Sequence, residues 1–163
     1  ANNPLERLYL IDPSGIRLLT DKPINLAGIS KDSSSAIVNI YGDTNVYESL
    51  VGIINLQTGE IEEYGPGIWI SRQDMSGNES KMSSDKRYVA CEQIGGFTGE
   101  NYVIDFAVID RVTKEIKHLD IWSKSNFDYR WVGDTNSLLI YDHGGKVCLY
   151  NADNGDMTEL SLF

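Results

Sequence analysis

Residues 30–38 read Ser30-Lys31-Asp32-Ser33-Ser34-Ser35-Ala36-Ile37-Val38, an aspartate-marked turn followed by an apolar strand. The same signal recurs without a gap as Ser83-Ser84-Asp85-Lys86-Arg87-Tyr88-Val89-Ala90-Cys91 and as Val132-Gly133-Asp134-Thr135-Asn136-Ser137-Leu138-Leu139-Ile140. Each carboxylate can accept backbone N–H groups of its own turn, so we expect a structural role for Asp32, Asp85 and Asp134. Short strands that repeat every 40 to 50 residues, roughly, are typical of propeller blades.

A second signal, a tight hairpin turn that ends in an acid and an aliphatic residue, follows each copy of the first. It reads Asn55-Leu56-Gln57-Thr58-Gly59-Glu60-Ile61, Asp110-Arg111-Val112-Thr113-Lys114-Glu115-Ile116 and Asn151-Ala152-Asp153-Asn154-Gly155-Asp156-Met157, with a shortened copy at Asp12-Pro13-Ser14-Gly15-Ile16. Gly59, Gly155 and Gly15 stand where such a turn needs a positive φ. Lys114 takes this place in the second repeat, so we expect that turn to be strained or of another type.

The two signals divide the chain into β-propeller blades, each a four-stranded antiparallel meander with strands A to D. We expect one all-β domain over residues 1–163, with an orphan hairpin at 7–20 and blades at about 24–65, 80–120 and 128–162. In the second blade strand A is expected near Lys81–Ser83. Strands B and C are apolar on both faces, which requires cover on both sides.

The chain therefore holds about three and a half blades, whereas single-chain propellers close with about four to eight. We interpret it as part of a larger propeller; an oligomer of the repeats or an open, irregular stack are the alternatives. The outer faces of the first and last sheets would be as apolar as the faces buried between blades, and a monomer rarely exposes so much apolar surface. We expect the chain to self-associate, to pair with missing blades, or to cover one end with Gly65–Lys81, and the hairpin to extend a sheet edge.

Composition excludes several classes of partner. The chain has 163 residues and a net charge of -10, which argues against nucleic acid, because phosphate binding depends on clustered Lys and Arg. Apolar runs such as Leu50–Ile54 are far shorter than the roughly 20 residues of a membrane span. Cys91 and Cys148 lie in apolar strands and are interpreted as buried hydrophobic residues, with a disulfide between blades as the alternative.

The pattern Ser-x-Asp-x-x-x before a strand, followed by Asn/Asp-x-x-Thr-Gly-Glu at a hairpin, resembles two families of propeller repeat. These are the TolB-like repeats of bacterial envelope proteins and the propeller domains of prolyl oligopeptidase-type peptidases. The resemblance covers Leu8 to Leu162, although the Pro and Gly that usually flank the family's Asp are mostly replaced here, which leaves the subfamily open. It implies an extracytoplasmic location, in the periplasm, in the envelope or outside the cell, with a cytoplasmic one as the alternative.

Catalytic motifs are missing from the sequence. It contains two histidines, His118 and His143, and no Gly-x-Ser-x-Gly elbow or zinc-ligand spacing. His118 is expected in solvent on an outer strand and His143 in a turn. Asp43 to Glu48 carry oxygen atoms at alternating positions, as calcium ligands do, but lack the pattern of an EF-hand loop, so a plain polar loop is preferred. We predict no catalytic residue, metal or cofactor.

Loops between strands B and C, and between strand D and the next strand A, emerge on one face of a propeller. That face would gather the candidate binding residues Asp43, Glu48, Trp69, Phe97, Trp122 and His143. The alternative is that the two tryptophans fill crevices between blades. We predict a non-catalytic interaction or scaffolding module that binds a protein, a peptide or further blades. The competing hypothesis is a substrate-gating propeller whose serine-peptidase domain lies outside this chain.

Overall fold

The computed structural model describes residues 7–41, 49–70, 81–98, 101–123, 127–141 and 145–161. Within these ranges the regular structure is all β, in one two-stranded and three four-stranded antiparallel sheets. The strands are β1 (Leu8–Asp12), β2 (Gly15–Thr20), β3 (Ile24–Ile29), β4 (Ser35–Ile40), β5 (Leu50–Asn55), β6 (Ile61–Tyr64), β7 (Ile68–Trp69), β8 (Tyr88–Thr98), β9 (Asn101–Asp110), β10 (Glu115–Ser123), β11 (Asp128–Trp131), β12 (Ser137–Tyr141), β13 (Val147–Asn151) and β14 (Met157–Leu160).

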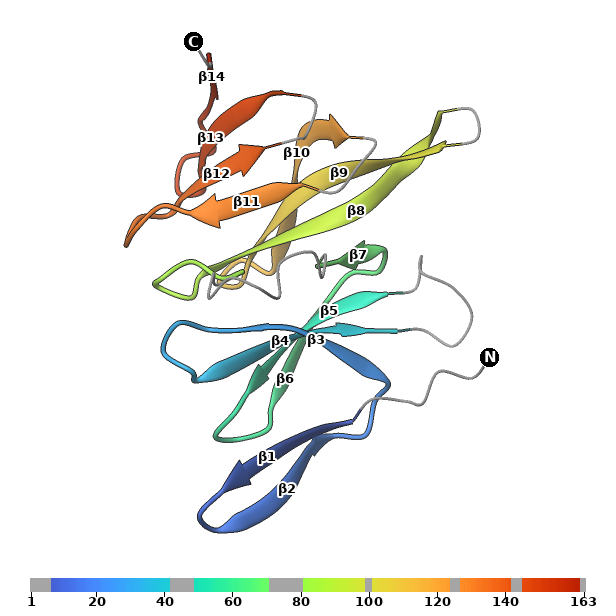
Figure 1. Ribbon diagram of the computed structural model, residues 1–163, viewed down its shortest axis with the longest axis vertical. Helices are drawn as coiled ribbons and strands as arrows, with labels where there is room; N and C mark the ends of the chain where they lie inside the picture. The colour runs from blue at the N-terminus through green and yellow to red at the C-terminus, as the bar shows by residue number, and fades with distance from the viewer. Residues whose placement is uncertain are drawn as a thin grey trace.

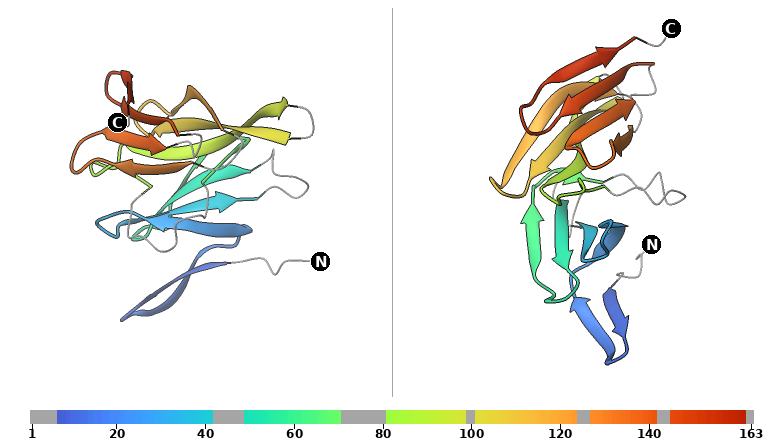
Figure 2. Two further views of the ribbon diagram at one scale, coloured as in Figure 1. Left: turned by 45° about the horizontal axis from the view of Figure 1, so that its top comes forward. Right: turned by 90° about the vertical axis from the view of Figure 1, so that its left-hand side faces the viewer.

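The sheets follow one another in chain order, with the β1–β2 hairpin at one end and the β11–β14 sheet at the other (Figure 1). Two further views show the same succession (Figure 2). Every four-stranded sheet is a meander of consecutive strands, which we call the first, second and third blade. The predicted all-β architecture, a hairpin followed by three blades, is confirmed.

The first and second blades each bury apolar side chains on both of their faces. We call the face toward the preceding sheet backward and the face toward the following sheet forward. All six residues of β4 are buried: Val38 packs backward against the hairpin side, whereas Ile37 packs forward against the second blade. Side chains that alternate along one strand therefore pack in two different seams, the layers of buried side chains between neighbouring sheets. The two-sided apolar pattern predicts this arrangement.

The hairpin stacks on the first blade instead of extending a sheet edge, so that expectation is wrong. Leu8, Leu10 and Leu19 fall on one face of the hairpin and pack on the backward face of the first blade. On the same side Arg17 donates hydrogen bonds to the carbonyl oxygens of Leu56 and Gln57, at 2.8 and 3.0 Å. The contact is made face to face because successive side chains of β1 and β2 point to opposite faces, which puts Leu8, Leu10 and Leu19 on the same one.

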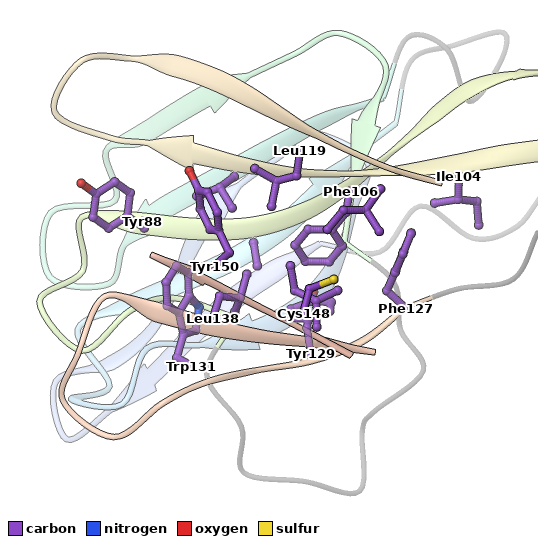
Figure 3. Close-up of a cluster of buried hydrophobic side chains, with 14 residues drawn as sticks. Tyr88, Ile104, Phe106, Leu119, Phe127, Tyr129, Trp131, Leu138, Cys148 and Tyr150 are labelled. Carbon is purple, nitrogen blue, oxygen red and sulfur yellow. The ribbon is translucent and has the colours of Figure 1, made fainter. Parts of the chain in front are cut away.

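The seam between the second and third blades is the most aromatic of the three (Figure 3). The Phe106 ring makes edge-to-face contacts with Phe127 and Tyr129, at centroid distances of 5.2 and 5.0 Å. Tyr88 stacks on Trp131 at 6.3 Å. Cys148 lies in this seam and Cys91 in the preceding one, and no disulfide joins these two buried residues.

The C–D turns share one geometry in all three blades. The first residue of each turn, Asn55, Asp110 or Asn151, accepts the backbone N–H groups two and three residues later. Gly59 and Gly155 have φ of 80°, and Lys114 has φ of 64° at the equivalent position. The second turn is therefore of the same type and strained, since a left-handed conformation costs a residue with a Cβ roughly 1–2 kcal/mol.

Replacing Gly59 with alanine is expected to lower the free energy of unfolding by about 1–2 kcal/mol, because a residue with a Cβ is strained at this positive φ. The nearest atom to that methyl group, Nη1 of Arg17, lies 3.7 Å away, so no clash adds to the cost. Gly28→Ala is the matched control, since its Cβ would make an ordinary contact at 3.5 Å and no left-handed φ is involved. Urea unfolding measures both variants; equal effects would contradict the prediction.

The A–B turns confirm the structural role of two aspartates and correct the third. Asp32 accepts the N–H of Ser34, and Asp85 accepts the N–H of Arg87. Asp134 makes no such bond to its described turn, where Thr135 Oγ1 accepts the N–H of Ser137 and donates to the carbonyl of Val132. Thr135 thus replaces Ser30 and Ser83, because those serine hydroxyls accept the equivalent N–H groups of Ser35 and Tyr88 in the other two turns, whereas the third turn has Val132 in the serine position.

The three A–B turns converge and contact one another. Lys86 Nζ lies 2.7 Å from Asp32 Oδ2, Asn136 Nδ2 donates to Asp85 Oδ2 at 3.0 Å, and Lys31 Nζ lies 3.1 Å from Asp134 Oδ1. These contacts are exposed and contribute little stability individually. They show that the inner ends of the three blades gather at one place, as in a propeller.

Strand A of the second blade is split, which the sequence did not predict. β7 pairs with Glu92 and Gln93, and Met82 forms a bridge with Val89 three residues earlier on β8. The expected strand near Lys81–Ser83 is thus the second half of a strand that begins at Ile68. Ile68, Ile70 and Met82 are each 1% exposed in the seam between the first two blades. The expectation that Gly65–Lys81 covers an end stays a prediction, because residues 71–80 lie outside the described residues.

Candidate functional site

Four of the six candidate binding residues cannot be placed. Asp43, Glu48 and His143 lie outside the described residues, together with the calcium-like stretch between Asp43 and Glu48. Phe97 belongs to β8, but its side chain is also outside the description. Among the described residues no group of three or more His, Cys, Asp or Glu side chains could hold a metal ion.

Trp69 and Trp122 do not come together. Trp69 lies on the inner strand β7, half buried, and packs on the forward side of the second blade. Trp122 lies on the outer strand β10 opposite Asp105, on the backward side, and is 49% exposed. Three strand spacings, roughly 14 Å, separate the two positions. Trp69 therefore packs at a seam, whereas Trp122 presents its ring to solvent.

A β-bulge between His118 and Trp122 shapes the surface around Trp122. Asp120, inside the bulge, has φ of 55°, and the register places His118 opposite Ala107 and Trp122 opposite Asp105. His118, Trp122 and Asp105 thus share the backward face. Leu119 and Ile121 alternate with these residues, so they point to the other side and pack in the aromatic seam.

His118 is exposed on the outer strand, as expected, and it is also paired with a buried carboxylate. Its Nδ1 lies 3.1 Å from Asp105 Oδ2, and the Asp105 side chain is 5% exposed against 43% for His118. Burial raises the pKa of Asp105, and the hydrogen bond with His118 opposes that shift. The available signal was a charged residue inside the apolar stretch Val103–Ile109, since a buried carboxylate needs a partner.

Asp105 can orient the imidazole of His118, as the carboxylate of a catalytic triad orients its histidine. The described residues do not supply a nucleophile, the third member of such a triad. Among the described residues Asp105 is the hydrogen-bond partner of His118. A nucleophile within hydrogen-bond reach is required for covalent catalysis. The described geometry is that of a surface histidine held in place by a buried carboxylate.

A second buried carboxylate, Glu92, lies at the forward seam and was also missed. Its Oε1 accepts the backbone N–H of Phe127 at 3.2 Å, and its Oε2 has no partner among the described residues. Desolvation raises the pKa of Glu92 to about 7. The equivalent residue of the first blade is Asn39, which both donates to and accepts from the backbone of Ile70. Both side chains hold the next inner strand across a seam.

A charge cluster joins the outer strands of the first two blades at the turn end. Arg111 donates to Glu62 at 2.6 and 3.2 Å, and Lys114 Nζ lies 3.0 Å from Glu62 Oε2 and 3.1 Å from Tyr64 Oη. The hydrogen bond from Arg111 leads the effects that lower the pKa of Glu62 to about 2. Every charged group here has a partner, so the cluster links blades and offers no reactive group.

Stacked four-stranded meanders whose inner turns converge define the chain as a segment of a β-propeller. Solved structures confirm this fold. The β-propeller domain of the Trilobed protease from Pyrococcus furiosus aligns with a TM-score of 0.57 and 18% identity, over 86% of this chain and 44% of that one. TolB from Acinetobacter baumannii aligns with a TM-score of 0.55 and 16% identity, over 96% of this chain and 37% of that one.

This chain spans less than half the length of either protein. No protein-family model and no curated protein sequence matches it. Among the described residues no helix is long and apolar enough to cross a membrane. The comparisons therefore establish the propeller fold, which TolB shares with the propeller domain of a protease.

Proposed function

We propose that the chain is a non-catalytic propeller segment that binds a protein or peptide partner. The observation that carries this proposal is Trp122, which is 49% exposed beside the His118–Asp105 pair on a bulged outer strand. An exposed tryptophan on a rigid sheet loses little entropy on binding, and tryptophan is enriched among binding hot spots. The incomplete triad around His118 supports a binding role over a catalytic one.

Trp122→Ala is expected to weaken binding of a peptide ligand by about 2 kcal/mol or more, roughly 30-fold, because tryptophan is enriched among the hot-spot residues that dominate binding energy. Peptides selected from a displayed random library on the whole chain provide the probe, and titration calorimetry measures the affinity. Val112→Ala is the matched control, since Val112 is 72% exposed but lies in a C–D turn. Selected peptides that bind Trp122→Ala as tightly as the unmodified chain would count against the proposal.

The second candidate function is the substrate-gating propeller of a prolyl oligopeptidase-type peptidase. The likeness to the propeller domain of a protease, at a TM-score of 0.57, favours it as much as the likeness to TolB favours the binding module. The full coding sequence distinguishes them. A downstream Gly-x-Ser-x-Gly with later Asp and His would support the peptidase. A signal peptide or lipid anchor without that domain would support the binding module and the proposed extracytoplasmic location.

A further inference from the structure

The surface around Trp122 is negatively charged. Asp105 lies opposite Trp122 on β9, and Asp120 lies in the bulge of β10. Burial is the main cause that raises the pKa of Asp105, and the charge of Asp120 adds to it, so the two carboxylates are close enough to interact. Lys117, the lysine of β10, lies on the other side of the sheet, where its Nζ is 5.4 Å from the centre of the Tyr150 ring.

Basic side chains at the turn end of this blade are already paired. Arg111 and Lys114 lie 2.6 and 3.0 Å from the carboxylate of Glu62 in the first blade. Over the whole chain the acidic residues outnumber the basic ones, 24 against 14. A cation from outside the chain is therefore the charged group that the Trp122 surface attracts.

The Trp122 surface lies between two blades that this chain contains. The first and second blades flank it, so no further blade is needed to form it. The seam between them buries Ile37, Val89 and Ile109, each 0% exposed, and these side chains hold the sheet that carries Trp122. A ligand therefore meets a surface that is already ordered, which lowers the entropy cost of binding.

The His118–Asp105 pair presents a hydrogen-bond acceptor on the same face. An ionised carboxylate only accepts hydrogen bonds, so His118 Nδ1, 3.1 Å from Asp105 Oδ2, carries the ring proton. The Nε2 atom of this neutral, 43% exposed side chain is then an acceptor. Oδ1 of Asp105 has no hydrogen-bond partner among the described residues, so no second donor offsets the carboxylate charge. The pair thus combines an acceptor with a net negative charge.

We propose that the surface formed by Trp122, His118 and Asp105 binds an arginine side chain of a peptide partner. A guanidinium group stacks on aromatic rings and donates N–H groups in its own plane. His118 and Trp122 pair with residues two places apart on β9, so roughly 7 Å separates their backbone positions, a distance that one guanidinium can span. The inference rests on the proposed peptide-binding function and specifies which residue the surface recognises.

Two synthetic peptides test the arginine specificity. They are acetyl-Gly-Gly-Arg-Gly-Gly-amide and the same peptide with citrulline, which has nearly the shape of arginine without its charge. The indole N–H signal of Trp122 in the NMR spectrum of the isotope-labelled whole chain follows binding at about pH 8, where an ordinary imidazole is neutral. Its absence from the spectrum of Trp122→Ala assigns the signal. We expect the arginine peptide to shift it and to bind about 10-fold more tightly than the citrulline peptide.

Charge and acceptor are removed separately by two variants. Asp105→Asn keeps the shape of the side chain without its charge, and His118→Ala removes the acceptor. Each is expected to reduce the preference for arginine over citrulline to about twofold or less. Glu159→Gln is the matched control, because it removes one negative charge at an exposed position of the third blade, and it should keep the full preference. Circular dichroism checks the folding of each variant; His118 is exposed, so its replacement remains informative if Asp105→Asn unfolds.

The outcomes separate this inference from the proposed function. Equal binding of the two peptides at Trp122 would overturn the arginine assignment and leave peptide binding at Trp122 supported. No shift of the Trp122 signal with either peptide would also overturn the assignment, while the peptides selected from a random library test the general binding function on their own. A preference that Glu159→Gln weakens as much as Asp105→Asn does would show attraction to the net charge of the chain, and would overturn it too.

Discussion

Phe106→Ala is expected to lower the free energy of unfolding by about 3–5 kcal/mol, which would remove a large share of the stability of a domain of this size. Phe106 is 0% exposed and contacts Phe127 and Tyr129 edge to face. Alanine would leave a cavity between the second and third blades and remove both ring contacts, each worth about 0.5–1.5 kcal/mol. Chemical unfolding followed by far-ultraviolet circular dichroism measures the loss.

Phe106→Leu is the control for this variant, because leucine refills much of the cavity while removing the ring contacts. It should therefore cost clearly less than alanine. The near-ultraviolet circular dichroism of the alanine variant should also change, since Trp131 and Tyr88 stack in the same seam. A loss below about 1 kcal/mol for the alanine variant, within the range of ordinary surface substitutions, would show that this seam is not closed in solution.

Glu92→Gln is expected to raise the free energy of unfolding above pH 7 by up to about 3 kcal/mol. Burial raises the pKa of Glu92 from 4.5 to about 7, and one pKa unit corresponds to about 1.36 kcal/mol. Below pH 4.5 the carboxyl is protonated in both the folded and unfolded chain. Between 4.5 and 7 only the unfolded chain loses the proton, so the Glu92 contribution to stability falls as the pH rises and then levels off.

The glutamine amide removes this pH dependence, and its NH₂ group can donate a hydrogen bond as that of Asn39 does in the preceding seam. The difference between variant and unmodified chain is the quantity to measure, because Glu62 acts in the opposite direction: its lowered pKa makes stability fall in acid. Glu159→Gln, which makes the same chemical change at an exposed position, is the control. A difference that does not change between pH 4 and pH 8 would contradict the prediction.

Sequence reasoning located the strands well because their signals are local. The left-handed positions at Gly59, Lys114 and Gly155 and the hydrogen-bonding side chains of Asn55, Asp110 and Asn151 act within a few residues. A turn of this kind forms from its own atoms, so three copies of the pattern predict three copies of the geometry. The third A–B turn differs because Val132 stands where the other two turns have a serine, and Thr135 accepts the N–H that those serines accept.

The candidate binding face was harder to predict because it depends on how strands lie beside one another. Trp69 and Trp122 were expected on one surface, yet they occupy opposite edges and opposite faces of the second blade. The bulge at Asp120 sets which residue Trp122 faces, and the split inner strand places Trp69 on β7; both depend on pairing between distant residues. Neither the bulge nor the split strand can be recognised from the local sequence pattern on which a strand prediction is based.

By itself the sequence determined the repeat, the order of the strands and the burial of both faces of strands B and C, because alternation and turn chemistry are properties of neighbouring residues. Only the tertiary structure decided which charged residues enter the seams. Asp105 and Glu92 lie in apolar strands, but the partners that make their burial tolerable, His118 and the N–H of Phe127, come from other strands. A buried charge depends on a partner brought to it by folding, and that partner's distance along the chain is not encoded locally.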